Sequence, residues 1–138
     1  MLDTTLEKVK KLIKEKDTLI SCFNMDIVNF QEGTASVSMN VKDNHVNAAG
    51  VCHGGVIFSL ADVAFAFACN SHGTLALALE MSISFLKAVQ PGETITAVCC
   101  ERHRGKSTGC YTIEVKDSQG KLIALLKATA FRKNTPFV

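Results

Sequence analysis

One segment limits the fold of this chain more than any other. Between Val56 and Cys69 only Ser59 and Asp62 are polar, and alanine is frequent among the rest. Fourteen residues is long for a strand, so we expect a helix, which we place at residues 53–72. Because apolar residues occupy nearly every side of it, this helix should be buried nearly all round. It is too short to span a membrane, and it carries an acid.

Most of the remaining chain has the pattern of strands. Residues 34–41 alternate polar and apolar without a break, which is typical of a half-buried strand, and residues 26–30 precede them as the other arm of a hairpin. Further strand-like runs are separated by turn residues at hairpin spacing, so we expect an antiparallel meander. These runs are residues 74–89, 93–104, 109–117 and 121–133.

A single helix that is apolar on all sides needs something that encloses it, and a strongly curved antiparallel sheet can do so. The sequence therefore predicts an α+β chain with the hot-dog fold, a curved antiparallel sheet wrapped around one long central helix. Residues 1–20 are predicted as an N-terminal amphipathic helix, because apolar residues recur there at helical spacing among lysines. Those residues are Leu2, Leu6, Val9 and Ile13. A length of 138 residues favours a single domain, residues 1–138.

Composition and charge exclude several classes of function. The formal net charge of +2 is too small to indicate a nucleic-acid partner by itself. Residues 1–17 lack the apolar core of a signal peptide, and no eighteen consecutive residues are apolar, so we expect no membrane span. Without an export signal, reduced cysteines in the cytoplasm are the expected state. The six cysteines are Cys22, Cys52, Cys69, Cys99, Cys100 and Cys110.

Asp62 is the residue of the central helix that most needs an explanation. An ionised carboxylate is very costly to bury without partners. Two interpretations are open: a structural acid bonded to a nearby amide or hydroxyl, or a catalytic acid or base reached from a cleft. Burial alone should raise the pKa of Asp62, which makes its carboxylate a better base.

Three residues, His53, Gly54 and Gly55, lead into the central helix. Glycine lets the backbone approach a ligand closely, and the first amide groups of a helix have no partner inside it. Such a terminus stabilises developing negative charge, as an oxyanion hole or a phosphate site. A plain helix entry that contains glycine explains the same residues equally well.

The spacing of Gly54 and Asp62 predicts how they could act together. Eight residues separate them, which is about 12 Å along a helix. A base must lie within about 3 Å of its proton, or one water away, so Asp62 cannot easily serve an oxyanion site on its own Gly54. If both groups act on one bond, two copies must meet with antiparallel helices. This predicts a homodimer with the site between its subunits.

Metal and cysteine chemistry are weaker interpretations. The cysteine–histidine pairs at residues 52–53 and 69–72 resemble zinc ligands, but roughly 25 Å of helix separates them. Four ligands must lie about 2.0–2.3 Å from one ion, so we predict no metal. A nucleophilic pair of Cys52 with His45 or His103 remains open, although Cys52 is more typical of a small packed residue.

The loop and the central helix resemble a known family. Residues 47–55, NAAGVCHGG, followed by FSLADVAFAFACNS, are similar to the PaaI-type hot-dog thioesterases, the phenylacetyl-CoA thioesterase group. ISFLKAVQPGETITA and RHRGKSTGCYTIEV resemble the same family, and the resemblance covers residues 25–133. It implies the hot-dog fold, hydrolysis of a thioester, and a homotetramer made of two dimers with sites at the dimer interface.

The resemblance also implies roles for single residues. Asp62 matches the catalytic carboxylate, which acts as nucleophile or as base, and Gly54 matches the residue whose amide polarises the thioester carbonyl. His53 matches a histidine that shapes the site, and Asn47 an asparagine that orients water or substrate. The chain departs from the family at residues 15–18, EKDT, where PaaI-type proteins can carry an asparagine.

The implied substrate is an acyl-CoA, such as phenylacetyl-CoA in phenylacetate degradation. Coenzyme A is then part of the substrate, and no separate cofactor is expected. Its phosphates need cations, and its acyl group needs apolar contacts near the helix. Candidate substrate-binding residues are Gly55, Phe58, Phe65, Arg102, Arg104 and Lys106. A thioesterase for acyl-carrier protein or other acyl-CoA esters, and a non-catalytic acyl-CoA-binding module, remain as alternatives.

Overall fold

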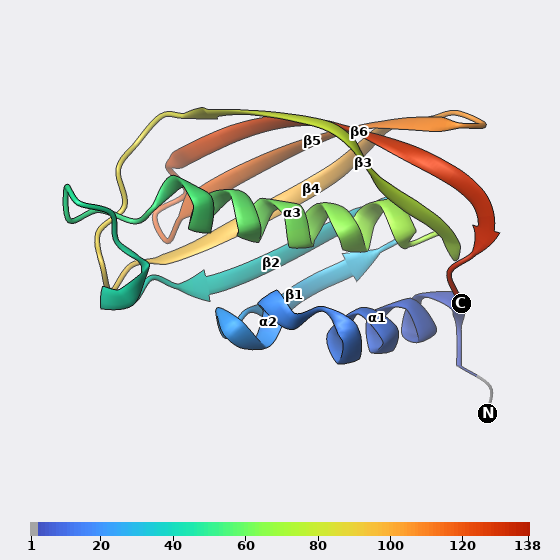
Figure 1. Ribbon diagram of the computed structural model, residues 1–138, viewed down its shortest axis with the longest axis horizontal. Helices are drawn as coiled ribbons and strands as arrows, with labels where there is room; N and C mark the ends of the chain where they lie inside the picture. Colours follow the sequence, from blue (N-terminus) through green and yellow to red (C-terminus); the bar gives the residue numbers. More distant parts are fainter. Residues whose placement is uncertain (1–2) are drawn as a thin grey trace.

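The computed structural model describes residues 3–138, so Leu2 of the predicted apolar stripe lies outside the described residues. Helices and strands follow one another along the chain as Figure 1 shows. The helices are α1 (Thr5–Lys16), α2 (Thr18–Cys22) and α3 (Gly54–Asn70), with a 3₁₀ turn η1 (Asp43–His45). The strands are β1 (Asp26–Gln31), β2 (Thr34–Asn40), β3 (Thr74–Phe85), β4 (Thr94–Arg104), β5 (Thr108–Asp117) and β6 (Leu122–Pro136).

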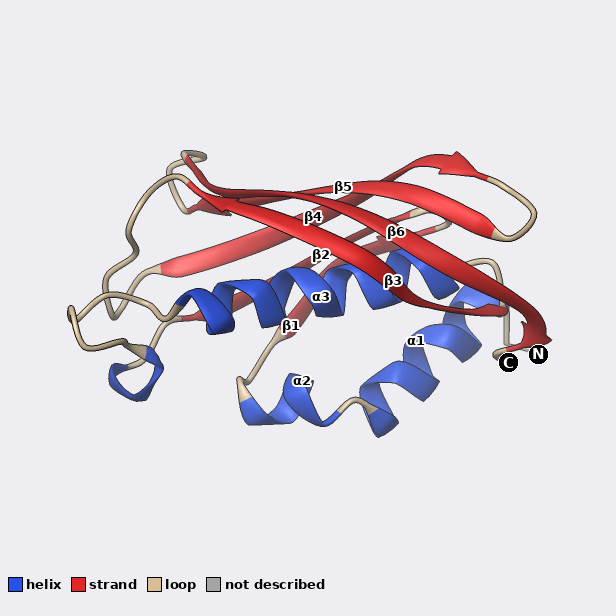
Figure 2. Ribbon diagram, turned by 45° about the horizontal axis from the view of Figure 1, so that its top comes forward, coloured by secondary structure: helices blue, strands red, loops and turns tan. Residues whose placement is uncertain are grey.

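The strands form one six-stranded antiparallel sheet in the order β1-β2-β4-β5-β6-β3. The sheet curves around α3, which contacts every strand along the inner face (Figure 2). This arrangement confirms the predicted hot-dog fold and the β1–β2 hairpin.

The predicted meander is confirmed for β4, β5 and β6 and is wrong for β3. β3 pairs with β6 at the edge of the sheet, while β4 pairs with β2 along its length. The chain crosses from β3 to β4 through residues 86–93, past the N-terminal end of α3. There the Cys52 N–H donates to the Val89 carbonyl at 2.7 Å. A meander assumes that consecutive strands pair, but the partner of β4 comes from before the central helix.

The central helix has close to the predicted bounds. His53 caps its first turn, because ring nitrogen Nδ1 accepts the N–H of Gly55. Gly73, at φ +87°, turns the chain back toward β3 after the last turn. Among residues 3–138, no helix is both long and apolar enough to cross a membrane.

One side of α3 is less buried than we expected. Its incompletely buried residues recur every fourth position, with two neighbours beside them, and form a stripe along the helix. We call this the open stripe; it consists of Gly54, Gly55, Phe58, Ser59, Asp62 and Ala66. The sheet, together with α1 and α2, covers the other sides of the helix. An apolar sequence does not distinguish a side that the same chain covers from a side available to another molecule.

The predicted helix of residues 1–20 is interrupted at Asp17. The backbone N–H of Asp17 bonds to the Ile13 carbonyl at 2.8 Å and ends α1, while its carboxylate accepts the N–H of Leu19 at 3.0 Å and begins α2. Val9 and Ile13 of the apolar stripe are buried, and α1 contacts α3 and β1. Because the chain changes direction at Asp17, both α1 and α2 contact the central helix.

Candidate active site

The N-terminus of α3 presents one backbone amide without a partner. The Gly55 N–H donates to Nδ1 of His53 at 3.1 Å, and the Val56 N–H donates to the His53 carbonyl at 2.9 Å. Within residues 3–138, the Gly54 N–H donates no hydrogen bond. Because the first amides of a helix carry partial positive charge, this N–H can stabilise an oxyanion. His53 satisfies its neighbours and leaves Gly54 available.

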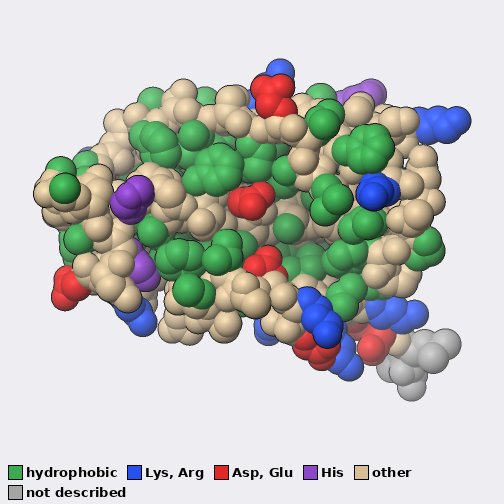
Figure 3. Space-filling view, in the orientation of Figure 1, with side chains coloured by type: hydrophobic (Ala, Val, Ile, Leu, Met, Phe, Trp, Pro, Cys, Tyr) green, Lys and Arg blue, Asp and Glu red, His purple; other side chains and the backbone are tan. Residues whose placement is uncertain are grey.

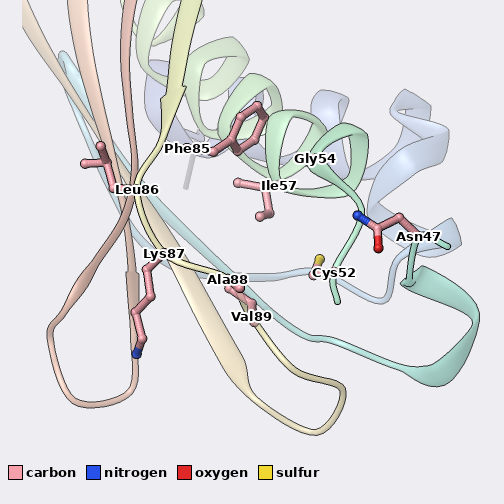
Figure 4. A pocket seen from close by; sticks show the side chains of 9 residues that line it. All are labelled: Asn47, Cys52, Gly54, Ile57, Phe85, Leu86, Lys87, Ala88 and Val89. Atoms are coloured by element: carbon pink, nitrogen blue, oxygen red, sulfur yellow. The ribbon is translucent and has the colours of Figure 1, made fainter. Parts of the chain in front are cut away.

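Gly54 borders a cavity of about 400 Å³, which we call the Gly54 cavity (Figure 4). A Cβ at position 54 would lie 2.9 Å from the ring of Phe85. A side chain at position 54 would therefore require the half-exposed ring of Phe85 to shift. The lining residues are Asn47, Cys52, Gly54, Ile57, Phe85, Leu86, Lys87, Ala88 and Val89.

Asn47 reaches the Gly54 cavity from the loop before α3. Its side-chain oxygen accepts the N–H groups of Ala49 at 2.9 Å and Val51 at 3.4 Å. These bonds hold the amide in place, with its nitrogen directed toward the segment that leads into Gly54 (Figure 4). The structure therefore brings together Asn47, His53 and Gly54, three of the predicted site residues.

Asp62 lies on the open stripe, two turns after Gly54. Its carboxylate makes no hydrogen bond and no ion pair within residues 3–138, and burial followed by the negative charge of Asp17 raises the pKa of Asp62. The interpretation as a structural acid requires a bonded partner, which the described chain does not supply. A half-buried, unbonded carboxyl with a raised pKa is typical of a functional site. The face in Figure 3 has acidic side chains in the middle of a broad apolar surface.

The structure does not bring Asp62 and Gly54 of one chain together. α3 is continuous from Gly54 to Asn70, so the two residues stay about 12 Å apart along its axis. Both lie on the open stripe. Each chain therefore carries an unpaired N–H and an unbonded carboxyl on the same side of one helix, too far apart to contact one bond.

The predicted substrate-binding residues occupy different regions. Gly55 and Phe58 lie on the open stripe, and Phe65 is buried one turn after Asp62. Arg102, Arg104 and Lys106 lie at the end of β4 and in the turn to β5, near the C-terminal end of α3 (Figure 1). Within one chain, these basic residues are therefore far from the Gly54 cavity.

Sequence reasoning missed a second cavity, of about 390 Å³, between α1, α3 and β3. We call it the α1 cavity. It is lined by Leu12, Ile13, Lys16, Asp17, Phe65, Ala66, Cys69, Asn70, Leu75, Ala76, Leu77 and Phe137. Aspartate is a preferred N-cap residue, so the helix break at Asp17 had a signal in the sequence. The approach of Asp17 to Asp62 had none, because it depends on how α1 packs.

Cysteine chemistry has little support in the structure. Burial raises the pKa of Cys52 to about 11, so its thiol stays protonated near neutral pH and is a poor nucleophile. Nδ1 of His45 accepts the N–H of Lys42 at 3.0 Å, and His103 lies near the far end of β4. Among residues 3–138, no three His, Cys, Asp or Glu side chains are grouped as a metal site.

The fold and this site define a class of protein: a hot-dog protein with an unpaired amide at the start of its central helix and an unbonded carboxyl two turns later. The model of the family described as "Thioesterase superfamily" matches residues 49–124. The chain belongs to the thioesterase superfamily; it is a PaaI-type hot-dog thioesterase and a thioester hydrolase.

Individual relatives agree with this assignment. The chain is 50% identical over 132 residues to a protein of Archaeoglobus fulgidus that carries an esterase name, covering 96% of this chain and 86% of the relative. It is 43% identical over 118 residues to the acyl-coenzyme A thioesterase PaaI of Escherichia coli, covering 86% and 84%. The structure of E. coli PaaI superposes with a TM-score of 0.92 at 39% identity over 96% of both chains. A Streptococcus mutans protein bound to acetyl-CoA gives a TM-score of 0.79 at 30% identity over 82% of this chain and 91% of that one.

Proposed function

We propose that this thioester hydrolase converts acyl-CoA to free acid and coenzyme A in a site shared by two chains. Asp62 of one subunit acts with the amide of Gly54 of the partner subunit. The E. coli relative is named an acyl-coenzyme A thioesterase, and the S. mutans relative is bound to acetyl-CoA, which supports CoA esters as the substrate class. Phenylacetyl-CoA is the first ester to test, because the E. coli protein comes from a phenylacetic acid degradation operon.

One observation carries the proposal: Gly54 has an unpaired N–H and Asp62 an unbonded carboxyl, on one stripe but about 12 Å apart. Two α3 helices placed antiparallel along their open stripes would set each Asp62 beside the other chain's Gly54. The pair then has the two functions that hydrolysis of a thioester needs, which are carbonyl polarisation and a placed base or nucleophile.

The reaction proceeds with one water per ester. The carbonyl oxygen accepts the Gly54 N–H. Asp62 either takes a proton from the water that attacks the carbonyl carbon, or attacks that carbon itself to form an anhydride that water then opens. In both routes the C–S bond breaks, the sulfur leaves as a thiolate and the acid is released. The amide nitrogen of Asn47 is placed to donate to the water or the ester, and His53 holds the first turn that presents Gly54.

The edge of the sheet supports the homodimer. β3 is twelve residues long and pairs only on its β6 side within the described chain. Leu77, Leu79 and Phe85 on this strand are 52%, 62% and 51% exposed. A long apolar edge strand is a template for pairing with another chain. A two-fold axis beside β3 would make the two α3 helices antiparallel, and two such dimers give the homotetramer that the family resemblance implies.

In this dimer the C-terminal end of one α3 lies toward the N-terminal end of the other. Arg102, Arg104 and Lys106 of one subunit are then nearer to the other subunit's Gly54 cavity than to their own, where they can meet the phosphates of coenzyme A. The cysteines of the chain are unpaired, which is typical of a reducing compartment. We place the enzyme in the cytoplasm.

Asp62→Asn tests the proposal, with Asp43→Asn, an exposed carboxyl of η1, as the matched control. Because a placed base contributes about 10²–10⁴-fold, Asp62→Asn should lower kcat/KM on phenylacetyl-CoA and straight-chain acyl-CoA esters by that range. Asp43→Asn should stay within about twofold. The same acyl group presented on coenzyme A and on acyl-carrier protein identifies the carrier.

The Tm of the Asp62→Asn variant shows whether the variant is folded, independently of its activity. Because the folded-state pKa of Asp62 is raised, the folded protein binds its proton more readily than the unfolded chain, and the ionised form lowers stability above the unfolded pKa. Asp62→Asn should therefore raise Tm at pH 7 while activity falls. Near wild-type activity of this variant on every hydrolysed ester would contradict the role of Asp62, and a light-scattering mass of one chain would contradict the shared site.

A further inference from the structure

We propose that the α1 cavity binds the acyl group of the substrate and selects uncharged apolar acyl groups larger than phenylacetyl. This inference rests on the proposed function and extends it, because it adds the substrate class and the residues that determine it. The Gly54 cavity is then left to the thioester and the thiol arm of coenzyme A.

The position of the α1 cavity on α3 is the first argument. Phe65 and Ala66 line it, and they follow Asp62 by three and four residues, so they lie beside it on the same helix face. They lie about 4.5–6 Å from Asp62 along the helix axis. Asp17 also lines the cavity, and its charge acts on Asp62. A thioester whose carbonyl carbon meets Asp62 can therefore extend its acyl group directly into this cavity.

The lining is the second argument. Apart from Lys16, Asp17 and Asn70, every lining residue has an apolar side chain or is cysteine. The amide of Asn70 is fully used: it donates to the carbonyls of Ala66 at 2.9 Å and Ala76 at 3.1 Å, and it accepts the Ala76 N–H at 2.8 Å. The wall around Asn70 thus has no spare polar group for a ligand.

Charge in the α1 cavity is confined to the end of α1. Lys16 is exposed, and the carboxylate of Asp17 already accepts the Leu19 N–H. The phosphates of coenzyme A require several cations, and one exposed lysine beside an aspartate does not supply them. An acyl group with its own carboxylate would find only Lys16, which is exposed to solvent and lies beside the negative charge of Asp17. The occupant that fits is uncharged and apolar.

The volume sets the size of the acyl group. An apolar cavity of about 150 Å³ holds benzene, and the α1 cavity has about 390 Å³. Phenylacetyl adds only two carbons to a benzene ring and leaves much of this space unfilled. Chains of about eight to twelve carbons fill it better, and each buried methylene improves binding about fourfold until the cavity is full.

Leu12→Trp tests the inference, with Leu6→Trp as the matched control. Both leucines lie on α1 and are half-buried, but only Leu12 lines the α1 cavity. Wild-type kcat/KM should rise with chain length from acetyl-CoA to decanoyl-CoA and should exceed the value for phenylacetyl-CoA. Leu12→Trp should lower the decanoyl/acetyl ratio of kcat/KM at least tenfold, while Leu6→Trp should leave that ratio within twofold. Ala66→Met narrows the same cavity from α3, and serves if Leu12→Trp does not fold.

Binding gives a readout that does not depend on hydrolysis. In the Asp62→Asn background, calorimetry should show decanoyl-CoA bound at least tenfold more weakly after Leu12→Trp, relative to acetyl-CoA. An unchanged ratio in both cavity variants, or a preference of the wild type for phenylacetyl-CoA over decanoyl-CoA, overturns the inference and leaves the proposed function standing. If wild type hydrolyses no CoA ester, the proposed function fails, and the binding ratio still decides whether the cavity takes the acyl chain.

Discussion

The two ends of α3 differ in how their polar groups are satisfied. At the C-terminal end, Asn70 bonds to the backbone of β3, Ser71 accepts an N–H from the β1–β2 turn, and the ring of His72 lies 2.8–2.9 Å from two carboxylates. At the N-terminal end, the Gly54 N–H has no partner within residues 3–138, and at the middle of the helix the carboxyl of Asp62 is unbonded. One helix is anchored at one end and left available at the other.

The pKa values of two carboxyls, Glu101 and Asp62, differ in the same way. Burial acts to raise the pKa of Glu101, but hydrogen bonds from Tyr111 and His72 outweigh it and hold that pKa below its usual value. For Asp62, burial and Asp17 raise the pKa with nothing to oppose them. Glu101 is bonded by its neighbours in the fold, whereas Asp62 and the Gly54 N–H, both on the open stripe, have no partner within residues 3–138. Unsatisfied groups lower stability and persist where function needs them.

Removal of the unpaired N–H at the start of α3 should lower activity more than any other change discussed below. Gly54→Pro does so at the first helical position, where proline is well tolerated, and His53, at φ −62° and ψ 134°, has the conformation that precedes proline. Gly54→Ala is the control, because both variants place a Cβ against Phe85 and only proline removes the N–H. The proline variant should have a kcat about 10²–10³-fold below that of the alanine variant, at a similar Tm.

The same variants test whether the two half-sites come from different chains. A hybrid of one Asp62→Asn chain and one Gly54→Pro chain contains one intact site if the site is shared, and none if it lies within a chain. Mixing and reassociating the two variants should restore about a quarter of wild-type activity. No recovery in a mixture proven to contain hybrids would contradict the antiparallel arrangement of the open stripes.

A substitution at the anchored end should lower the free energy of unfolding and hardly change kcat/KM. His72→Ala removes a side chain that is 5% exposed and leaves Glu101, 17% exposed, with Tyr111 alone. The free energy of unfolding should fall by about 2–3 kcal/mol, measured by urea denaturation, with kcat/KM within twofold of wild type. His103→Ala, an exposed histidine of β4, should change stability by less than about 0.5 kcal/mol.

The pH dependence of this loss has a definite sign. Because the folded pKa of Glu101 is lowered, its contribution to stability is present above the unfolded pKa and is lost as pH falls through the folded pKa. The stability difference between wild type and His72→Ala should therefore be full at pH 7 and shrink in acid. A large fall in kcat with unchanged stability would contradict the division between the two ends.

The available end could be predicted from the sequence more completely than the anchored end. Apolar length gave α3, alternation gave β2, and the residues from Asn47 to Gly55 with Asp62 carried the family resemblance, since all of these patterns are local. Their spacing on one helix also predicted that Gly54 and Asp62 of one chain do not meet, because helix geometry fixes that distance.

The rest depends on contacts between distant parts of the chain. His72 meets Glu32 forty residues before it and Glu101 twenty-nine residues after it, and no local pattern marks such a pair. The pairing of β3 with β6, and the α1 cavity bordered by α1, α3 and β3, likewise follow from how these elements pack against one another. The candidate phosphate-binding residues at 102–106 lie near the C-terminal end of α3 because of the direction of β4, and no local pattern in the sequence gives that position.

The charge of Asp17 should have a small effect on the pH dependence of activity. Asp17→Asn keeps the N-cap of α2, since asparagine caps as well as aspartate, but it removes the negative charge that adds to burial in raising the pKa of Asp62. Asp62 must be ionised to act, so activity falls as pH drops through its pKa, and a raised pKa places that fall at higher pH. In Asp17→Asn the acidic limb of kcat/KM should move to lower pH, yet remain above the usual aspartate range because burial persists. Glu15→Gln, an exposed carboxyl of α1, should not move it. If both variants leave the limb in place, burial alone keeps Asp62 poised and the break between α1 and α2 serves the α1 cavity only.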